Sequence, residues 1–365
     1  MRHTRGRVVE VETRRELESR LAGGAHDLEG WRIRSVDLTG VDLGGRRVAG
    51  AIFLGCTFGD AAVADLQSRG AVVFPTLPDV PLDSWRSELY TARELYGTGR
   101  YHDSLDARGY AWSQQVGHDG PDAALAATLH DHAVDSALGR WVEGRHVVGV
   151  MGGHAVRRGE AAYADAARLG RGLGRSLTVA TGGGPGAMEA ANLGAALSRE
   201  PLHVLDDALR HLATVPGFDC HIGAWARVGF DVVDRVARPV ESLGIPTWHY
   251  GHEPPNVFAT AIAKYVRNAV REAVLLEVCR AGIVFLPGAA GTVQEVFQDA
   301  CENYYADPAG VAPMVLVGRR HWTEELPVWP LLQRLAAGRG MEDHVHLVED
   351  VDDAVKVVTR NPPAT

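Results

Sequence analysis

Short apolar runs alternate with amphipathic stretches from about residue 145 to the end of the chain. The apolar runs lie at 147–151, 176–181, 245–248, 281–286, 314–317 and 346–348. Helical patterns separate them, at about 157–174, 189–197, 258–280, 327–337 and 351–358, with one more after 286. A strand that is apolar at every position is buried on both faces, and strands that alternate with helices form parallel sheets. The pattern therefore predicts an α/β fold with a doubly wound parallel sheet.

A different period marks residues 31–58. Apolar residues recur there at every fifth position, at Ile33, Leu38, Leu43, Val48, Phe53 and Phe58. This spacing resembles the pentapeptide repeat, a square β-helix that buries one apolar residue on each side, and it predicts a segment with a structural role. A pair of irregular strands with accidental spacing is the alternative.

The N-terminal extension is predicted to contain this pentapeptide-like β segment followed by helices. A strand at 71–74 precedes a proline-rich linker at 75–81, and helical patterns follow at about 83–97 and 121–142. We therefore expect three parts. They are an N-terminal β-rich segment (1–80), a helical connecting region (81–144) and the α/β domain (145–365).

Composition argues against several classes of protein. The chain has 365 residues, no apolar run near the ~20 that span a bilayer, and polar sequence after its first five residues, so neither a membrane span nor a signal peptide is expected. The net charge of −9 argues against nucleic-acid binding. The four cysteines, Cys56, Cys220, Cys279 and Cys301, form no CxxC pair, so we expect a cytoplasmic protein with reduced thiols and no metal site.

Two glycine-rich turns follow predicted strands, at 182–188 and at 287–292. Each leads into a helix, whose first N–H groups and dipole favour an anion such as phosphate. Glu295 lies near the end of the first helical turn after the second of them. A carboxylate would repel a phosphate, so its presence favours chemistry beside the phosphate over simple phosphate binding. Strand ends line the ligand crevice of open α/β sheets, which places both turns in one predicted site.

This pair of turns, GGGxxGxM at 182–188 and a variant of PGGxGTxxE at 287–295, resembles the Lonely Guy (LOG) family over about residues 145–320. Members of that family are Rossmann-like phosphoribohydrolases that cleave the N-glycosidic bond of nucleoside 5′-monophosphates. The stretch at 253–256 is similar to one in the larger bacterial nucleotide 5′-monophosphate nucleosidases of that superfamily. The resemblance implies a nucleosidase that acts on ordinary nucleotides such as AMP, needs no cofactor, and forms a homodimer or higher homo-oligomer.

The resemblance also implies roles for individual residues. Glu295 would be the catalytic carboxylate, which orients water and faces the ribosyl cation, and Arg271 would bind or orient the substrate. The implied phosphate- and nucleotide-binding residues are Gly153, His154, Gly182, Gly183, Gly184, Gly186, Met188, Asn268, Gly288, Ala289, Ala290, Gly291 and Thr292. No metal ligand is implied.

The chain departs from the family pattern at two places. Ala289 stands where the second glycine of PGG is usual, so phosphate binding requires a negative φ at that position. The family's Arg-Lys pair appears here as Arg271-Glu272, and only when a one-residue gap is allowed in the alignment.

Each assignment has a structural alternative. Glu295 could be a first-turn carboxylate that interacts with the helix dipole, Arg271 a surface residue, Met188 a core residue and His154 a local cap. His249 and His252 could gate the pocket or belong to an ordered aromatic loop. Cys220-His221 is disfavoured as a nucleophile pair, because adjacent residues seldom point the same way. For the whole protein, the alternative is a non-catalytic Rossmann module that senses a nucleotide.

Overall fold

The computed structural model describes residues 8–77, 79–97, 99–115, 121–219, 221–249 and 253–360. Pro78, Cys220, His252 and residues 1–5, on which predictions were made, lie outside the described residues. Contacts divide the chain into two units, one formed by Met1–Glu88 and Gln115–Ala137 and the other by Leu89–Gln114 and Leu138–Thr365. The expected connecting region at 81–144 is thus shared between the units. In the described part of the chain, no helix is long and apolar enough to cross a membrane.

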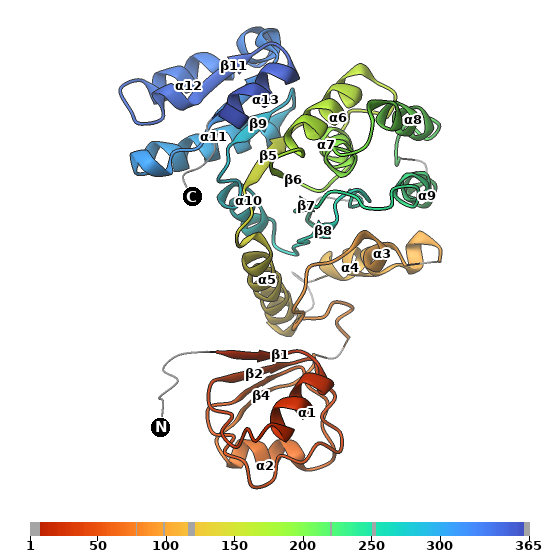
Figure 1. The fold of residues 1–365 in the computed structure, drawn as a ribbon, viewed down its shortest axis with the longest axis vertical. Coiled ribbons are helices and arrows are strands. Elements are labelled where there is room, and N and C mark those ends of the chain that lie inside the picture. The colour runs from red at the N-terminus through yellow and green to blue at the C-terminus, as the bar shows by residue number, and fades with distance from the viewer. Residues whose placement is uncertain are drawn as a thin grey trace. The chain divides into compact units, whose positions relative to one another are not determined.

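The first unit contains a parallel β coil, drawn in red to orange in Figure 1. Its strands hydrogen-bond in chain order and are β1 (Val9–Val11), β2 (Trp31–Arg34), β3 (Ile52–Leu54) and β4 (Val72–Phe74). Helix α1 (Arg14–Ala22) lies between β1 and β2, and α2 (Ala62–Ser68) between β3 and β4. Ile33 pairs with Phe53, and Phe53 pairs with Val73, so each step between these strands is 20 residues (53 − 33 and 73 − 53).

The five-residue period marks the inward face of this coil. Twenty residues are four periods, so residues at the same place in the period stack on one another from strand to strand. Five of the six periodic residues are buried in one apolar cluster, and the sixth packs against it: Ile33, Leu38, Leu43, Val48, Phe53 and then Phe58. The pentapeptide-like prediction is confirmed, and the alternative of accidental spacing is wrong.

The second unit contains a seven-stranded, all-parallel sheet in the order β11-β10-β9-β5-β6-β7-β8. The strands are β5 (Val147–Met151), β6 (Thr178–Thr181), β7 (Ser242–Gly244), β8 (Ala261–Ile262), β9 (Ile283–Phe285), β10 (Met314–Val317) and β11 (Val345–Val348). Every residue of β5, β9 and β10 is buried, as expected of strands covered on both faces. The predicted doubly wound α/β class is confirmed.

Helices cover both faces of this sheet (Figure 1). Helix α6 (Ala161–Leu173) packs on α7 (Ala187–Ala196) and α13 (Val351–Arg360), whereas α11 (Ala290–Tyr305) packs on α10 (Asn268–Glu277) and α12 (Val328–Ala336). The chain first adds strands on one side of β5 and later adds strands on the other side. Because the crossover connections are right-handed, the two sets of helices lie on opposite faces of the sheet. The other α-helices of this unit are α3 (Ala92–Tyr96), α4 (Leu105–Ser113), α8 (Leu202–Leu212) and α9 (Ile222–Val233), and α5 (Pro121–Val142) is divided between the two units.

Helices α6 and α7 approach each other closely enough for backbone contact. Every residue of α7 is buried. A Cβ on Gly170 would lie 2.0 Å from the carbonyl oxygen of Ala191, and a Cβ on Gly194 would lie 1.8 Å from that of Ala167. Glycine at these two positions therefore sets the distance between the helices, and with it the place of α7 under the sheet.

The β7–β8 edge differs from what the sequence predicts. The strand expected at 245–248 lies earlier, at β7, and the helix expected over 258–280 is divided into strand β8 and helix α10. Ala261 pairs with Leu243 of β7, so sheet pairing overrides the helical pattern at the start of that segment. The helix expected at 83–97 is limited to α3, and α4 is an additional helix.

Candidate functional site

The order of the strands reverses at β5. The chain adds β6, β7 and β8 on one side of β5 and then returns to add β9, β10 and β11 on the other. In open α/β sheets ligands bind outside the carboxyl ends of the strands at such a switch point. The turns that leave β5, β6 and β9 there are the segments that contain Gly153, Gly182–Gly186 and Pro287–Gly288.

Backbone hydrogen bonds hold these three turns together. The Ala187 N–H, at the start of α7, donates to the carbonyl oxygen of Gly153 at 3.1 Å. The Gly153 N–H donates in turn to the carbonyl oxygen of Pro287 at 3.3 Å. The two glycine turns predicted from the sequence therefore meet through Gly153, at the edge where a ligand would enter.

The start of α11 has the geometry of an anion site. Ala289 has φ −110°, so its replacement of glycine does not disturb the turn. The Val293 N–H donates to the carbonyl oxygen of Ala289, and the N–H groups of residues 290–292 precede this first helical bond. Gly291 is exposed and has open space beside its Cα, so a ligand can approach the backbone there.

His321 supports this turn from the next strand of the sheet. It begins a π-helical turn (His321–Glu325) after β10, and its Nε2 lies 3.3 Å from the amide nitrogen and 3.1 Å from the carbonyl oxygen of Gly288. Glu325 Oε2 lies 3.2 Å from Nδ1 of the same ring. Sequence reasoning missed His321, because only the pairing of β9 with β10 brings it beside the turn.

Arg271 on α10 and Glu295 on α11 face each other. Arg271 Nη1 lies 4.0 Å from Glu295 Oε1 and 2.9 Å from Glu272 Oε1. The rest of the guanidinium is bonded to the backbone, since Nε donates to the carbonyl oxygen of Ile245 at 2.8 Å and Nη2 to that of Gly182 at 3.4 Å. Arg271 thus links the catalytic carboxylate predicted on α11 to the glycine turn after β6. It is buried, so the alternative of a surface arginine is wrong.

Burial makes the carboxyl group of Glu295 a weaker acid than usual. Desolvation raises the pKa of this carboxyl from its usual 4.5 to about 7; Arg271 acts in the opposite direction, and Glu272 raises the pKa further. A carboxyl group with a pKa near neutral pH is suited to accept and return a proton. One turn later, Asp299 is also buried, and desolvation followed by the charge of Glu302 raises its pKa well above the usual value.

We expect Glu295→Gln to stabilise the protein at pH 8. The folded state prefers the protonated carboxyl, so the stability from this group is complete below pH 4.5 and is lost as the pH rises through 7. The difference between 4.5 and about 7 corresponds to about 3 kcal/mol, which a neutral glutamine does not lose. Urea unfolding should show an advantage of up to this size at pH 8 that falls below about 1 kcal/mol at pH 5. Equal advantages at both pH values would contradict the assignment.

A buried polar cluster fixes the first glycine turn. Thr181 Oγ1 donates to Asn192 Oδ1 at 2.7 Å and accepts from the Gly183 N–H at 2.9 Å. Asn256 donates from its backbone N–H to the carbonyl oxygen of Gly183 at 2.8 Å and from Nδ2 to that of Gly184 at 3.2 Å. Asn192 and Asn256 also bond to each other, at 3.0 Å. Asn256 belongs to the stretch at 253–256 that carried the second resemblance, whereas Asn192 and Thr181 gave no signal in the sequence.

The glycines of that turn pack mainly against the protein itself. A Cβ on Gly182 would lie 2.4 Å from Nη2 of Arg271, and one on Gly186, which has φ +74°, would lie 2.5 Å from the carbonyl oxygen of Gly153. Gly183 packs on Pro246 in the same way. Close packing inside the site therefore explains these glycines without a ligand. Met188 is buried, with its sulfur beside Gly182.

The remaining predicted residues lie at the margins of the site. Asn268 Nδ2 donates to Glu272 Oε1 at 3.3 Å, which connects it to Arg271 through the second carboxylate. His154 is 59% exposed and its Nδ1 lies 3.7 Å from Oε1 of Glu253. Thr292 is buried, and a Cβ on Gly288 would lie 2.2 Å from its Oγ1, so glycine is required there by the helix itself.

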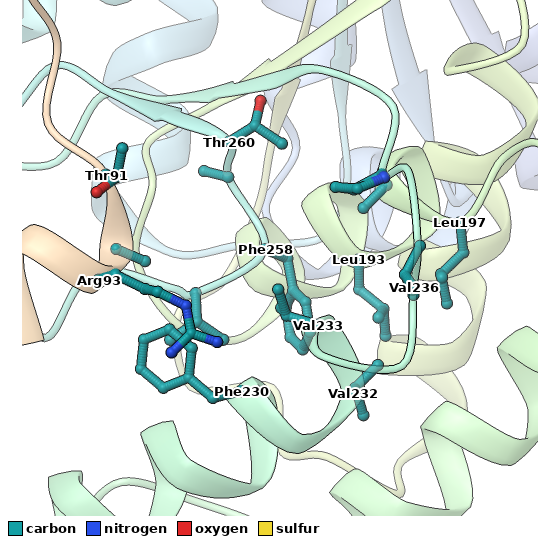
Figure 2. A pocket seen from close by; sticks show the side chains of 15 residues that line it. Thr91, Arg93, Leu193, Leu197, Phe230, Val232, Val233, Val236, Phe258 and Thr260 are labelled. Carbon is teal, nitrogen blue, oxygen red and sulfur yellow. The ribbon is translucent and has the colours of Figure 1, made fainter. Parts of the chain in front are cut away.

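A cavity of about 290 Å³ lies beside His154 and Gly186 and is also lined by the buried Glu189. An apolar pocket of about 200 Å³ lies elsewhere in the unit, between α3, α7, α9 and residues 257–260 (Figure 2). Leu193, Phe230 and Phe258 point into it, and its lining includes none of the three turns at the switch point. The second pocket is therefore separate from the candidate site.

Comparisons with known proteins give no family. No family model matches the chain, and no curated protein matches it. Solved structures that are similar include the molybdenum cofactor binding protein from the phototrophic bacterium Rippkaea orientalis, at 14% identity and a TM-score of 0.38 over 59% of this chain and 96% of that one. Another is the Moco carrier protein from Chlamydomonas reinhardtii, at 17% identity and a TM-score of 0.37 over 59% and 96%. Likeness at this level assigns no activity to the chain.

Proposed function

We propose that this protein hydrolyses the N-glycosidic bond of nucleoside 5′-monophosphates, releasing free base and ribose 5-phosphate. The observation that carries the proposal is the position of Glu295. This buried carboxyl has a pKa of about 7, lies 4.0 Å from Arg271, and follows the anion-accepting start of α11 by one helical turn. A phosphate, a ribose and a water molecule could be held in this order along α11.

In the proposed reaction the bond between C1′ and the base nitrogen breaks, and its electron pair leaves with the base. Water adds to C1′ of the oxocarbenium-like ribosyl group, and one of its protons passes to the Glu295 carboxylate. The base anion takes up one proton as Glu295 gives up the one it accepted, so the carboxylate is regenerated. Atoms and charge balance with water as the only co-substrate. Glu295 acts in its ionised form, and its negative charge also stabilises the developing cation.

The surrounding residues would bind the rest of the nucleotide. The N–H groups of Ala290, Gly291 and Thr292 would donate to the 5′-phosphate, aided by the helix dipole. Arg271 would hold Glu295 in place and contribute positive charge on the phosphate side. Met188, beside Gly182 and Gly184, would contact the flat base through its thioether.

The second candidate is a non-catalytic module that binds a nucleotide. One observation favours it: Arg271 is already bonded to Glu272 and to two backbone carbonyl groups, which is also what a purely structural arginine would show. The catalytic proposal also gives no direct role to the other buried acid groups, Asp299 on α11 and Glu272 on α10. Base release separates the two candidates, because binding alone leaves the nucleotide intact.

The experiment compares 5′-monophosphates with the corresponding nucleosides as substrates. If the start of α11 binds the phosphate, kcat/KM for AMP should exceed that for adenosine by about 10³-fold or more, since a charge-assisted phosphate contact contributes several kcal/mol. Free base is measured by chromatography. Equal hydrolysis of both substrates would place the phosphate outside the site, and stabilisation by AMP without any base release would favour the binding module.

A further inference from the structure

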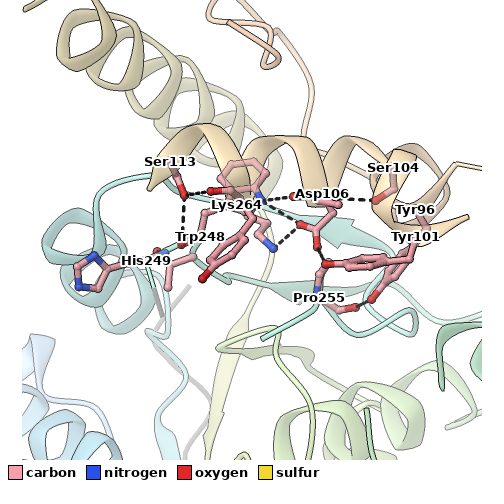
Figure 3. A network of polar contacts seen from close by, with 12 residues as sticks. Tyr96, Tyr101, Ser104, Asp106, Ser113, Trp248, His249, Pro255 and Lys264 are labelled. Carbon is pink, nitrogen blue, oxygen red and sulfur yellow. Dashed lines mark hydrogen bonds and ion pairs between the residues drawn. The ribbon is translucent and has the colours of Figure 1, made fainter. Parts of the chain in front are cut away.

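A buried ion pair connects α4 to the end of the sheet. Lys264, two residues after β8, places its Nζ 2.5 Å from Oδ1 of Asp106 in the first turn of α4 (Figure 3). Each of these side chains is at most 2% exposed. Both belong to the α/β unit, although they are far apart in the sequence.

The Asp106 carboxylate receives further donors from its surroundings. Trp248 Nε1 donates to Oδ1 at 3.0 Å, and the Tyr101 hydroxyl donates to Oδ2 at 2.8 Å. The Lys264 ammonium also lies 5.0 Å from the centre of the Trp248 ring, within the range of a cation–π contact. Burial lowers the pKa of Lys264, and Asp106 opposes that effect. The cluster is therefore well bonded at every charged atom that the structure describes.

Helices α3 and α4, with the residue that caps α4, also bind the backbone of Trp248 and of Pro255. The Ser113 hydroxyl and the Gln114 amide each donate to the carbonyl oxygen of Trp248 at 3.3 Å. The Tyr96 hydroxyl donates to the carbonyl oxygen of Pro255 at 2.6 Å (Figure 3). The next residue, Asn256, makes the hydrogen bonds to Gly183 and Gly184 described above.

A buried ion pair is a poor source of stability, because removing both charges from water costs about as much as their attraction returns. Such pairs are better explained where they fix one arrangement of the surrounding chain. Here the pair joins α4 to the residues that follow β8, and its Asp106 carboxylate also accepts the hydrogen bond from Trp248. The pair therefore fixes the Trp248 side chain through Asp106, and Tyr96 separately fixes the carbonyl group of Pro255.

We propose that Asp106, Lys264 and Tyr96 are positioning residues, which hold Trp248 and Pro255 in place so that the adjacent Asn256 fixes the Gly183–Gly184 turn against the nucleotide. This inference rests on the proposed function for its ligand. It makes α3 and α4 part of the substrate site, with an effect on nucleotide binding greater than their effect on the chemical step.

The test compares Lys264→Met and Tyr96→Phe with the exposed controls Lys356→Met and Tyr305→Phe. Each of the first two variants should raise KM for a 5′-monophosphate about tenfold and change kcat less than about threefold, whereas the controls should change neither. Tyr96→Phe removes a single hydroxyl, so it keeps the test informative if Lys264→Met does not fold. Unchanged KM in Tyr96→Phe, or an equal fall of kcat at constant KM, would overturn the proposal.

Amide hydrogen exchange gives a readout that needs no activity. In nucleotide-free protein, peptides that cover 182–190 and 253–260 should exchange at least about tenfold faster in Tyr96→Phe than in wild type, while peptides from β5 and β9 remain unchanged. If the wild type hydrolyses no nucleotide but this exchange pattern appears, the proposed function fails and the positioning role stands. If nucleotides are hydrolysed and exchange is the same in all variants, the positioning role fails alone.

Discussion

Glu295→Gln is expected to lower kcat for base release by about 10²- to 10⁴-fold, the usual contribution of a general acid–base group. The reason is that glutamine keeps the shape and much of the hydrogen bonding of the side chain but can neither accept a proton nor offset a cation. Nucleotide affinity should change little, because the substitution does not affect the N–H groups at residues 290–292, which are proposed to bind the phosphate. The measurement is kcat from steady-state base release together with Kd from calorimetry.

Glu302→Gln is the matched control for this prediction. Glu302 lies on the same helix, seven residues beyond Glu295 (302 − 295) and farther from the start of the helix. It should retain kcat within about threefold of wild type. A Glu295→Gln variant as active as Glu302→Gln would mean that the carboxylate beside Arg271 takes no part in the chemistry.

Gly194→Ala is expected to destabilise the α/β unit by about 3 kcal/mol or more, because overpacking in a rigid core is costly and here the obstacle is backbone. The new Cβ would lie 1.8 Å from the carbonyl oxygen of Ala167, so α6 and α7 must move apart. That movement would displace the start of α7, which bonds to Gly153 through Ala187. Activity should therefore fall together with stability.

Gly139→Ala is the control for this substitution. Gly139 lies in helix α5, and nothing is within 4 Å of the position of its Cβ. Its replacement should be neutral or stabilise by up to about 1 kcal/mol, from helix propensity alone. Hydrogen exchange of β5 and β6 in increasing urea measures both variants in the unit concerned. Equal stability of the two variants would contradict the backbone contact between α6 and α7.

Regular patterns in the sequence predict most of the fold. Strands such as β5 and β10 are continuous apolar runs, and the five-residue step from Ile33 to Phe53 marks the inward face of the coil. The two-residue strand β8 could not be predicted, because it is too short to have a period and forms only by pairing with β7.

The candidate site was predictable where its residues are adjacent in sequence. The turn at 287–292 and Glu295 lie on one strand–turn–helix unit, and their placement follows from it. Gly182 and Gly186 were interpreted as ligand-facing, whereas Arg271 and Gly153 occupy the space that their missing side chains leave. The pairing of Asp106 with Lys264 was not predictable, because it joins residues 158 positions apart.

The most direct test of the proposed function is the detection of both products after incubating the pure protein with AMP, GMP, CMP, UMP and IMP. The proposal predicts that at least one nucleotide yields free base and ribose 5-phosphate in equal amounts, measured together by chromatography and mass spectrometry. Absence of free base from all five nucleotides, with the nucleotides recovered intact, would contradict it.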